Sequence, residues 1–197
     1  MRYAGISSKG LFGVVLLMTL ALLSACSPQY DWRMVTLGDG RVRAMLPDKP
    51  HTAEREFNFE GHEITFVLTS ASVEGVSFTV GYADLPEGLR TDASARERLV
   101  RQTQASLYQN LGVTPPASLP AAGEHFTVTA PDSGSGQLHA EGLRLEAMIW
   151  ATSHALIEGI VIGKAGTLPQ TQIKEFLREL APDQRLDLAK EAQAEAF

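Results

Sequence analysis

The chain has 197 residues, of which 44% are hydrophobic and 20% charged, a composition typical of a single globular domain rather than of a disordered chain. Asp and Glu outnumber Lys and Arg by 23 to 17, and this acidic balance argues against a nucleic-acid partner. The single cysteine excludes an internal disulfide and a metal site built from clustered cysteines.

The N-terminal residues 1–25 have the layout of a bacterial secretory signal peptide. Arg2 and Lys9 make the start basic, residues 11–23 are apolar and uncharged, and small residues follow. The apolar segment is shorter than the roughly 20 residues that a helix needs to span a bilayer. The pattern therefore favours a cleaved signal over a permanent membrane helix.

The signal ends in Leu23-Ser24-Ala25-Cys26, which resembles the lipobox of bacterial lipoproteins. The resemblance implies cleavage between Ala25 and Cys26 and covalent attachment of lipid to Cys26. We therefore expect a lipid-anchored protein of the bacterial cell envelope that faces the periplasm. Ser27 follows the cysteine in place of an aspartate, which in a Gram-negative envelope favours the inner leaflet of the outer membrane. A plain secretory signal with an incidental cysteine is the alternative.

A short tether follows the lipidated cysteine. Residues 27–31 separate Cys26 from the first predicted strand at Trp32, and even fully extended they reach at most about 17 Å. We expect the domain to work close to the membrane, held there by the lipid on Cys26. Its partner is then a membrane-bound or periplasmic protein.

The first half of the folded region reads as a series of strands. Apolar runs at 32–37 and 41–46 flank Gly38-Asp39-Gly40, which predicts a hairpin because Asp-Gly supplies the positive φ angles of a tight turn. Alternation of apolar and polar residues predicts further strands at 54–59, 62–72 and 76–82.

The periodicity then changes to that of a helix. Ser94 and Glu97 form a capping-box pattern, and a helix is predicted from about Asp92 to Asn110, with Gly112 as its stop. After a loop at 115–123, strands are predicted at 124–129, 138–141, 143–151 and 154–162. The apolar stripe of Ile173, Phe176, Leu177 and Leu180 predicts a second helix that begins near Pro169 and lies on a sheet.

The order of these elements predicts an α+β domain over residues 32–181, followed by a tail at 182–197 that has weak helical character. Short turns between strands imply an antiparallel sheet, of about seven to nine strands, flanked by two main helices. The runs Val42–Pro50 and Val76–Pro86 and the helix at Ile173–Leu180 resemble the PsbP/MOG-type fold of exported proteins. That resemblance implies accessory and assembly roles and transfers no catalytic residue.

The sequence contains no motif that assigns a catalytic, cofactor-binding or metal-ligating residue. His62-Glu63 begins like a zinc-protease motif, but Phe66 stands where the second histidine would be. The histidines at 51, 62, 125, 139 and 154 lack metal-ligand spacing, although neighbouring strands would bring some of them together in one alternative interpretation. Trp32, Trp150, Phe57, Phe59, Phe66 and Phe78 are predicted to fill the core.

We therefore predict a non-enzymatic protein without a cofactor, whose one assigned site is the lipid attachment at Cys26. A membrane-anchored binding or assembly module is the favoured function. The alternatives are a carrier with an apolar pocket between sheet and helix, and an enzyme whose site assembles only in three dimensions. A deep apolar pocket favours the carrier, a flat exposed patch favours the module, and clustered histidines with a carboxylate favour the enzyme.

Overall fold

The computed structural model describes residues 29–131 and 142–180. All the helices and strands of the described residues lie in the compact unit that starts at Asp31. In these described ranges, no helix combines the length and the apolar character needed to cross a bilayer. Several predictions concern residues outside the described part: the signal peptide 1–25, the lipid site Cys26, the strand 138–141, His139 and the tail 182–197.

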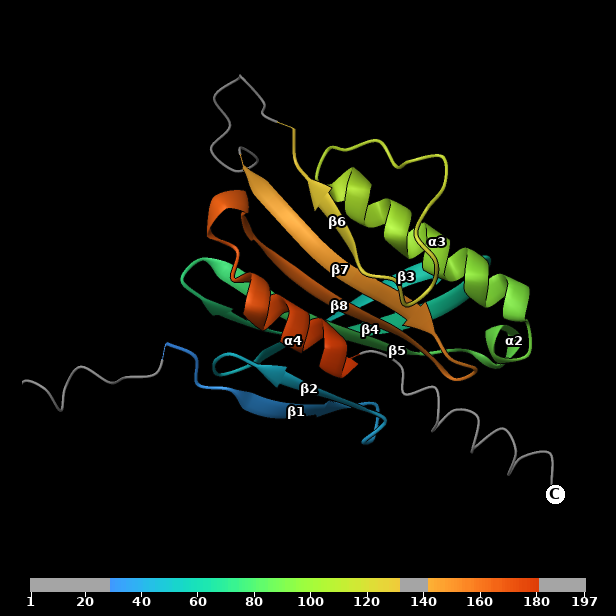
Figure 1. Cartoon of the computed structure of the whole chain (residues 1–197). Helices are drawn as coiled ribbons and strands as arrows, with labels where there is room; N and C mark the ends of the chain where they lie inside the picture. The colour runs from blue at the N-terminus through green and yellow to red at the C-terminus, as the bar shows by residue number, and fades with distance from the viewer. Residues whose placement is uncertain (1–28, 132–141, 181–197) are drawn as a thin grey trace, which may run out of the picture. The chain divides into compact units, whose positions relative to one another are not determined.

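The domain contains eight strands and a few helices in the described residues, in the α+β class that the sequence predicts. The elements are β1 (Arg33–Leu37), β2 (Val42–Leu46), β3 (His51–Phe59), β4 (His62–Val73), β5 (Val76–Asp84), α2 (Glu87–Arg90), α3 (Ala93–Asn110), β6 (Phe126–Thr129), β7 (Leu143–Ala151), β8 (Ala155–Lys164), the short 3-10 helix η1 (Ala165–Thr167) and α4 (Gln170–Leu180). All strand pairs are antiparallel, as expected from the short turns (Figure 1).

The strands do not form one sheet, and this corrects the prediction of about seven to nine strands in a single sheet. Six strands pair in the order β3-β4-β5-β8-β7-β6, while β1 and β2 form a separate hairpin. The hairpin packs through β2 on α4 and β5 (Figure 1). Apolar side chains of β2 (Ala44 and Leu46) are buried in that position, which explains why the hairpin covers a face of the sheet instead of extending an edge.

The pairing of β5 with β8 joins the two halves of the chain. β3, β4 and β5 follow one another directly, and β6, β7 and β8 form a second group after α3. Eight residues of β5 pair with β8, from Ser77 opposite Ile162 to Asp84 opposite Ala155. The register places Gly81 opposite Glu158 in the centre of the sheet.

The two faces of the sheet have different covers (Figure 1). α4 and the β1–β2 hairpin cover one face, where Phe78 packs edge-on against Phe176 at 5.5 Å and against Trp32 at 6.0 Å between ring centroids. α3 packs on the other face, mainly over β7. Tyr108 of α3 stacks on Phe126 of β6 with ring centroids 5.8 Å apart. Because α3 lies mainly over β7 and β6, it covers the same face of β3, β4 and β5 less closely.

The start of α3 differs in detail from the prediction. The helix begins at Ala93 with Asp92 as its N-cap, so the capping box at Ser94 and Glu97 is wrong. The Asp92 carboxylate accepts hydrogen bonds from the Ala95 N–H at 2.9 Å and from the Ser94 hydroxyl at 2.7 Å. A carboxylate at this position also interacts favourably with the positive end of the helix dipole, which a serine hydroxyl does not.

Phe176→Ala should destabilise the domain strongly. Its side chain is 1% exposed and joins α4 to β5, so truncation leaves a cavity at the junction of the sheet and the hairpin. We expect a loss of roughly 3–5 kcal/mol in the free energy of unfolding, measured by urea denaturation. Met34→Ala is the control, since the Met34 side chain is 66% exposed and its truncation should change stability by less than about 0.5 kcal/mol. Equal effects of the two changes would contradict this packing.

Candidate functional site

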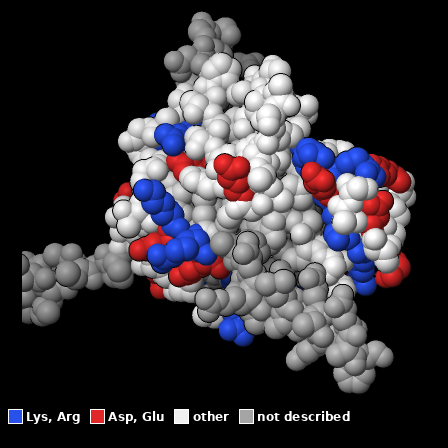
Figure 2. Space-filling model, turned by 45° about the vertical axis from the view of Figure 1, so that its right-hand side comes forward, with Lys and Arg blue, Asp and Glu red and all other residues white. Residues whose placement is uncertain are grey.

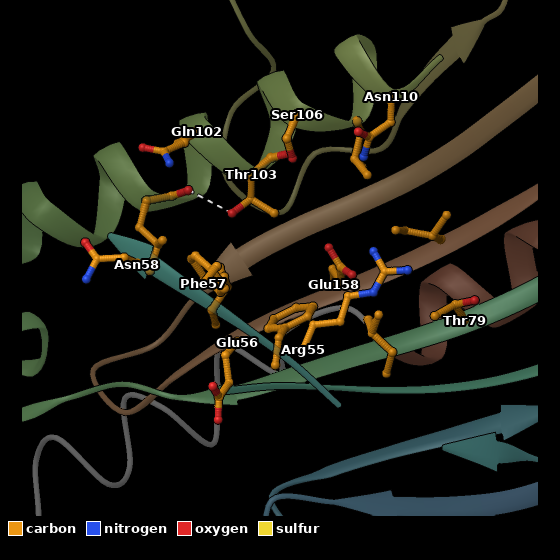
Figure 3. A pocket seen from close by; sticks show the side chains of 16 residues that line it. Arg55, Glu56, Phe57, Asn58, Thr79, Gln102, Thr103, Ser106, Asn110 and Glu158 are labelled. Carbon is orange, nitrogen blue, oxygen red and sulfur yellow. Dashed lines mark hydrogen bonds between the residues drawn. The ribbon is translucent and has the colours of Figure 1, made fainter. Parts of the chain in front are cut away.

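A cavity of about 620 Å³ lies between α3 and the strands β3, β4, β5 and β8 (Figure 3). Its volume is within the range of roughly 300–1,000 Å³ that is usual for small-molecule sites. The sheet supplies most of the apolar wall, and both the sheet and α3 supply polar side chains. The apolar lining includes Phe57, Phe66, Leu68, Leu99, Leu156 and Ile160, and the polar lining includes Arg55, Thr79, Gln102, Thr103, Ser106 and Asn110.

Strand and helix periodicity explain why these side chains meet. Arg55 and Phe57 are two residues apart on β3, and they pair with Phe66 and Ile64 of β4, so all of them lie on the α3 face of the sheet. On α3, residues three or four apart share a face, which brings Thr103 and Ser106 over the cavity. The Thr103 hydroxyl donates a hydrogen bond to the Leu99 carbonyl at 2.9 Å (Figure 3).

Glu158 is the unusual residue of this cavity. It lies on β8, near the centre of the sheet, and is only 5% exposed. A Cβ at Gly81, its partner on β5, would come within 2.5 Å of Glu158 Cγ and within 2.5 Å of the Phe66 ring. The missing side chain at position 81 therefore makes the space in which the Glu158 carboxyl lies.

The Glu158 carboxyl lacks the partners that a buried acid usually has. Neither a hydrogen bond nor an ion pair reaches it from the described part of the chain, and the Arg55 guanidinium acts on it only through its charge. Burial raises the pKa of Glu158 to about 8, and the positive charge of Arg55 opposes that rise. At neutral pH the group is therefore mostly protonated, and it places a neutral O–H donor in the cavity.

A second buried acid, Glu146 on β7, has the polar partners that Glu158 lacks in the described residues. Glu146 is 1% exposed and lies on the α4 face of the sheet. Gln170 Nε2 donates to its Oε1 at 2.9 Å, Arg144 Nη2 lies 3.0 Å from the same oxygen, and His125 Nε2 lies 2.9 Å from Oε2. These contacts tie the start of α4 to β7, so Glu146 has a structural role. Glu158 has no comparable role in the described residues.

The structure separates the histidines that the sequence analysis considered. His125 contacts Glu146, His51 and His154 are exposed, and His62 lies beside Gly88. Within residues 29–131 and 142–180, no three His, Cys, Asp or Glu side chains are grouped closely enough to hold a metal ion. The enzyme alternative thus gains no histidine–carboxylate cluster from the described residues beyond the His125–Glu146 pair.

The aromatic residues only partly follow the prediction that they fill the core. Phe59, Phe66, Phe78 and Trp150 are buried. Trp32 and Phe57 are half-buried. Phe57 packs edge-on against Phe66 with ring centroids 6.4 Å apart, and both rings form part of the cavity wall.

Sequence reasoning missed Glu158 and Arg55. The sequence signal for Glu158 was a single acid within the apolar run Ala155–Ile162. Burying a charged residue in a central strand is destabilising unless the residue is paired or has a role in binding or catalysis. Arg55 gave no such signal, because it stands in an exposed, mixed-charge stretch of β3.

The surface of α3 carries charges of both signs. Arg98 pairs with Glu60 at 2.8 Å and Arg101 pairs with Glu97 at 2.9 Å. On the face that Figure 2 shows, Lys and Arg side chains stand among Asp and Glu side chains and do not form a broad basic patch. The expectation that nucleic acid is not a partner stays a prediction.

Comparison with known proteins gave no match. No protein-family model matches the sequence, and no curated protein and no solved structure is significantly similar to it.

Glu158→Gln should stabilise the domain at neutral pH and flatten its pH dependence. The native pKa of about 8 lies above the ordinary value of 4.5, so between these values the native state binds a proton that the unfolded state has lost. The stability due to protonated Glu158 is complete below about pH 4.5 and is lost as the pH rises towards 8, by about 1.4 kcal/mol per pH unit. From about pH 5 to pH 7, the wild type should lose roughly 2–3 kcal/mol more than the variant in urea denaturation.

Glu63→Gln is the matched control for this measurement. It makes the same chemical change at an exposed position of β4, and its stability profile should follow that of the wild type. Parallel profiles of wild type and Glu158→Gln would show that Glu158 is ionised at neutral pH and would contradict the description of the site.

Proposed function

We propose that this protein is a lipid-anchored binding protein of the bacterial cell envelope that holds a small amphipathic molecule in the cavity under α3. The observation that carries the proposal is the buried Glu158 carboxyl, unpaired among the described residues, in the wall of a cavity of about 620 Å³. A buried acid without a partner destabilises the folded domain. Hydrogen bonding of this carboxyl to a ligand would give the residue a function that accounts for its presence. The favoured function thus becomes the carrier, which the sequence analysis held as an alternative.

The anchoring part of the proposal depends on the sequence. The lipobox at Leu23–Cys26 supports lipid attachment at Cys26, and the short tether at 27–31 supports a position close to the membrane. We also propose a PsbP/MOG-like relationship for the fold. It is supported by an antiparallel sheet with helices on both faces, by the Val42–Pro50 run that spans β2, and by the Val76–Pro86 run that spans β5.

An assembly module that binds another protein is the second candidate function. The observation in its favour is the open edge of the six-stranded sheet at β3, where residues 51–56 are all exposed. An edge strand presents unpaired backbone groups that a strand of another protein can extend. The charges of Glu54, Arg55 and Glu56 weaken this candidate, because charged side chains are a usual protection against edge pairing.

Filling the cavity should abolish the binding of an apolar probe. N-phenyl-1-naphthylamine is neutral, and its fluorescence rises in apolar surroundings, so we expect it to bind the wild-type domain. Ser106→Trp places an indole over the cavity from α3 and should reduce the fluorescence gain by at least about fivefold. The measurement is a fluorescence titration of the purified full chain without its signal peptide.

Gln109→Trp is the matched control, since it adds the same side chain to an exposed position of α3 outside the cavity. This variant should bind the probe as the wild type does. Failure of the wild type to bind the probe, or equal binding by Ser106→Trp, would contradict a ligand site at this place.

The anchor has its own test. Cys26→Ser should abolish labelling of the protein by a radioactive fatty acid in growing cells and leave an uncleaved precursor, because both steps require the cysteine. Ser27→Ala changes the neighbouring hydroxyl and should leave labelling intact. A wild-type protein that starts at another residue and carries no lipid would refute the lipoprotein assignment.

A further inference from the structure

We propose that the ligand is an amphipathic carboxylate whose headgroup lies between the Arg55 guanidinium and the Glu158 carboxyl, with its apolar part against Phe57, Phe66 and Ile160. This inference rests on the proposed function and names the chemical class that the cavity selects. Arg55 and Glu158 reach the same part of the cavity from β3 and β8 (Figure 3).

Glu158 supplies a hydrogen-bond donor that has no acceptor in the described structure. The acid is mostly protonated at neutral pH because burial raises its pKa to about 8. A ligand carboxylate accepts this proton donor in a charge-assisted O–H···O⁻ hydrogen bond, which is stronger than a neutral one. The like-charge repulsion that two ionised carboxylates would suffer is absent, since only the ligand is charged.

Arg55 supplies the positive charge. It is the one cationic side chain in the cavity wall, and it forms no ion pair with any acid of residues 29–131 and 142–180. The neighbouring Glu56 points away from α3, on the opposite side of β3 (Figure 3). The guanidinium is therefore available to a ligand, and its planar donors match the two oxygens of a carboxylate.

The opposite headgroup, an ammonium, fits these charges poorly. An ion pair with an ammonium would require Glu158 to release its proton to solvent, and burial of the carboxyl opposes that ionisation. It would also bring a second positive charge close to the Arg55 guanidinium. A neutral alcohol avoids both penalties, but its oxygen lacks the negative charge that strengthens the hydrogen bonds with both residues.

The other elements around Glu158 add no competing charge. β4 contributes Phe66 and Leu68, β5 contributes Thr79 and Gly81, and the α3 lining carries only apolar, hydroxyl and amide side chains. Within the described residues, Arg55 and Glu56 are thus the charged groups at this cavity besides Glu158 itself. The pH dependence of binding should consequently report Glu158.

Three probes of one chain length separate the headgroups: decanoate, decylammonium and decanol. Calorimetric titration of the full chain without its signal peptide, at about pH 7, should give the highest affinity for decanoate. We expect it to exceed decanol by about tenfold or more, because the decanol hydroxyl carries no negative charge at either headgroup contact. Above about pH 8 the affinity for decanoate should fall about tenfold per pH unit, because Glu158 then loses its proton.

Variants test the two headgroup contacts. Arg55→Gln and Glu158→Leu should each weaken decanoate binding by about tenfold or more, since each removes one charge-assisted contact. Glu158→Gln keeps an N–H donor, so it should hold decanoate within about fivefold of the wild type and remove the fall in affinity above pH 8. Arg43→Gln, at an exposed position of β2, is the matched control and should change nothing. Circular dichroism and urea denaturation establish that each variant is folded.

The outcomes distinguish this inference from the proposed function. Tightest binding of decylammonium, with an affinity that rises with pH and is lost in Glu158→Gln, would overturn the carboxylate assignment and keep the cavity as a ligand site. Equal affinities for decanoate and decanol would also overturn it. If none of the three probes binds and the neutral fluorescent probe fails as well, both the inference and the proposed function are wrong.

Discussion

The antiparallel pairing of β5 with β8 is the constraint on which the domain depends. It joins the meander β3-β4-β5 to the later strands β8-β7-β6 and so creates one sheet from two groups of strands. The register of this pairing also determines which side chains lie on each face of the sheet. Phe78 and Val161 lie opposite each other on the face under α4, while Gly81 and Glu158 lie opposite each other on the face under α3. A shift by one residue would exchange these faces and would remove both the aromatic core and the site.

The two buried glutamates show how the same side chain serves packing in one place and binding in another. Glu146 receives contacts from Gln170, Arg144 and His125, which offset the cost of removing its charge from water. Glu158 has none of these in the described residues and avoids the cost by keeping its proton. The Glu158 carboxyl is mostly protonated at pH 7 and faces the cavity, so it can donate a hydrogen bond to a ligand there. This difference, and not burial alone, separates the proposed site from the rest of the core.

Much of the fold follows from local pattern. Glycine-containing turns and apolar alternation place the β1–β2 hairpin and the strands β4 and β5 almost to the residue, and the stripe of Ile173, Phe176 and Leu177 correctly places α4 on the sheet. The predictions are wrong where contacts between residues far apart in the sequence determine the bounds or the position of a strand. β3 begins at His51, earlier than predicted, because its first residues pair with β4 as far as Ser70. The hairpin leaves the main sheet because α4, more than a hundred residues later, buries it.

The sequence by itself determined the class of the domain, its antiparallel connections and the buried face of α4, while the lipid site at Cys26 stays a prediction. These are properties of neighbouring residues, and periodicity and turn chemistry report them directly. Only the tertiary structure decided the site. Gly81, Arg55 and Glu158 come from three strands far apart in the chain, and the space for the carboxyl exists because one particular register sets a glycine opposite an acid. No local pattern encodes that coincidence, because strand partners and register are fixed by the packing of the whole domain.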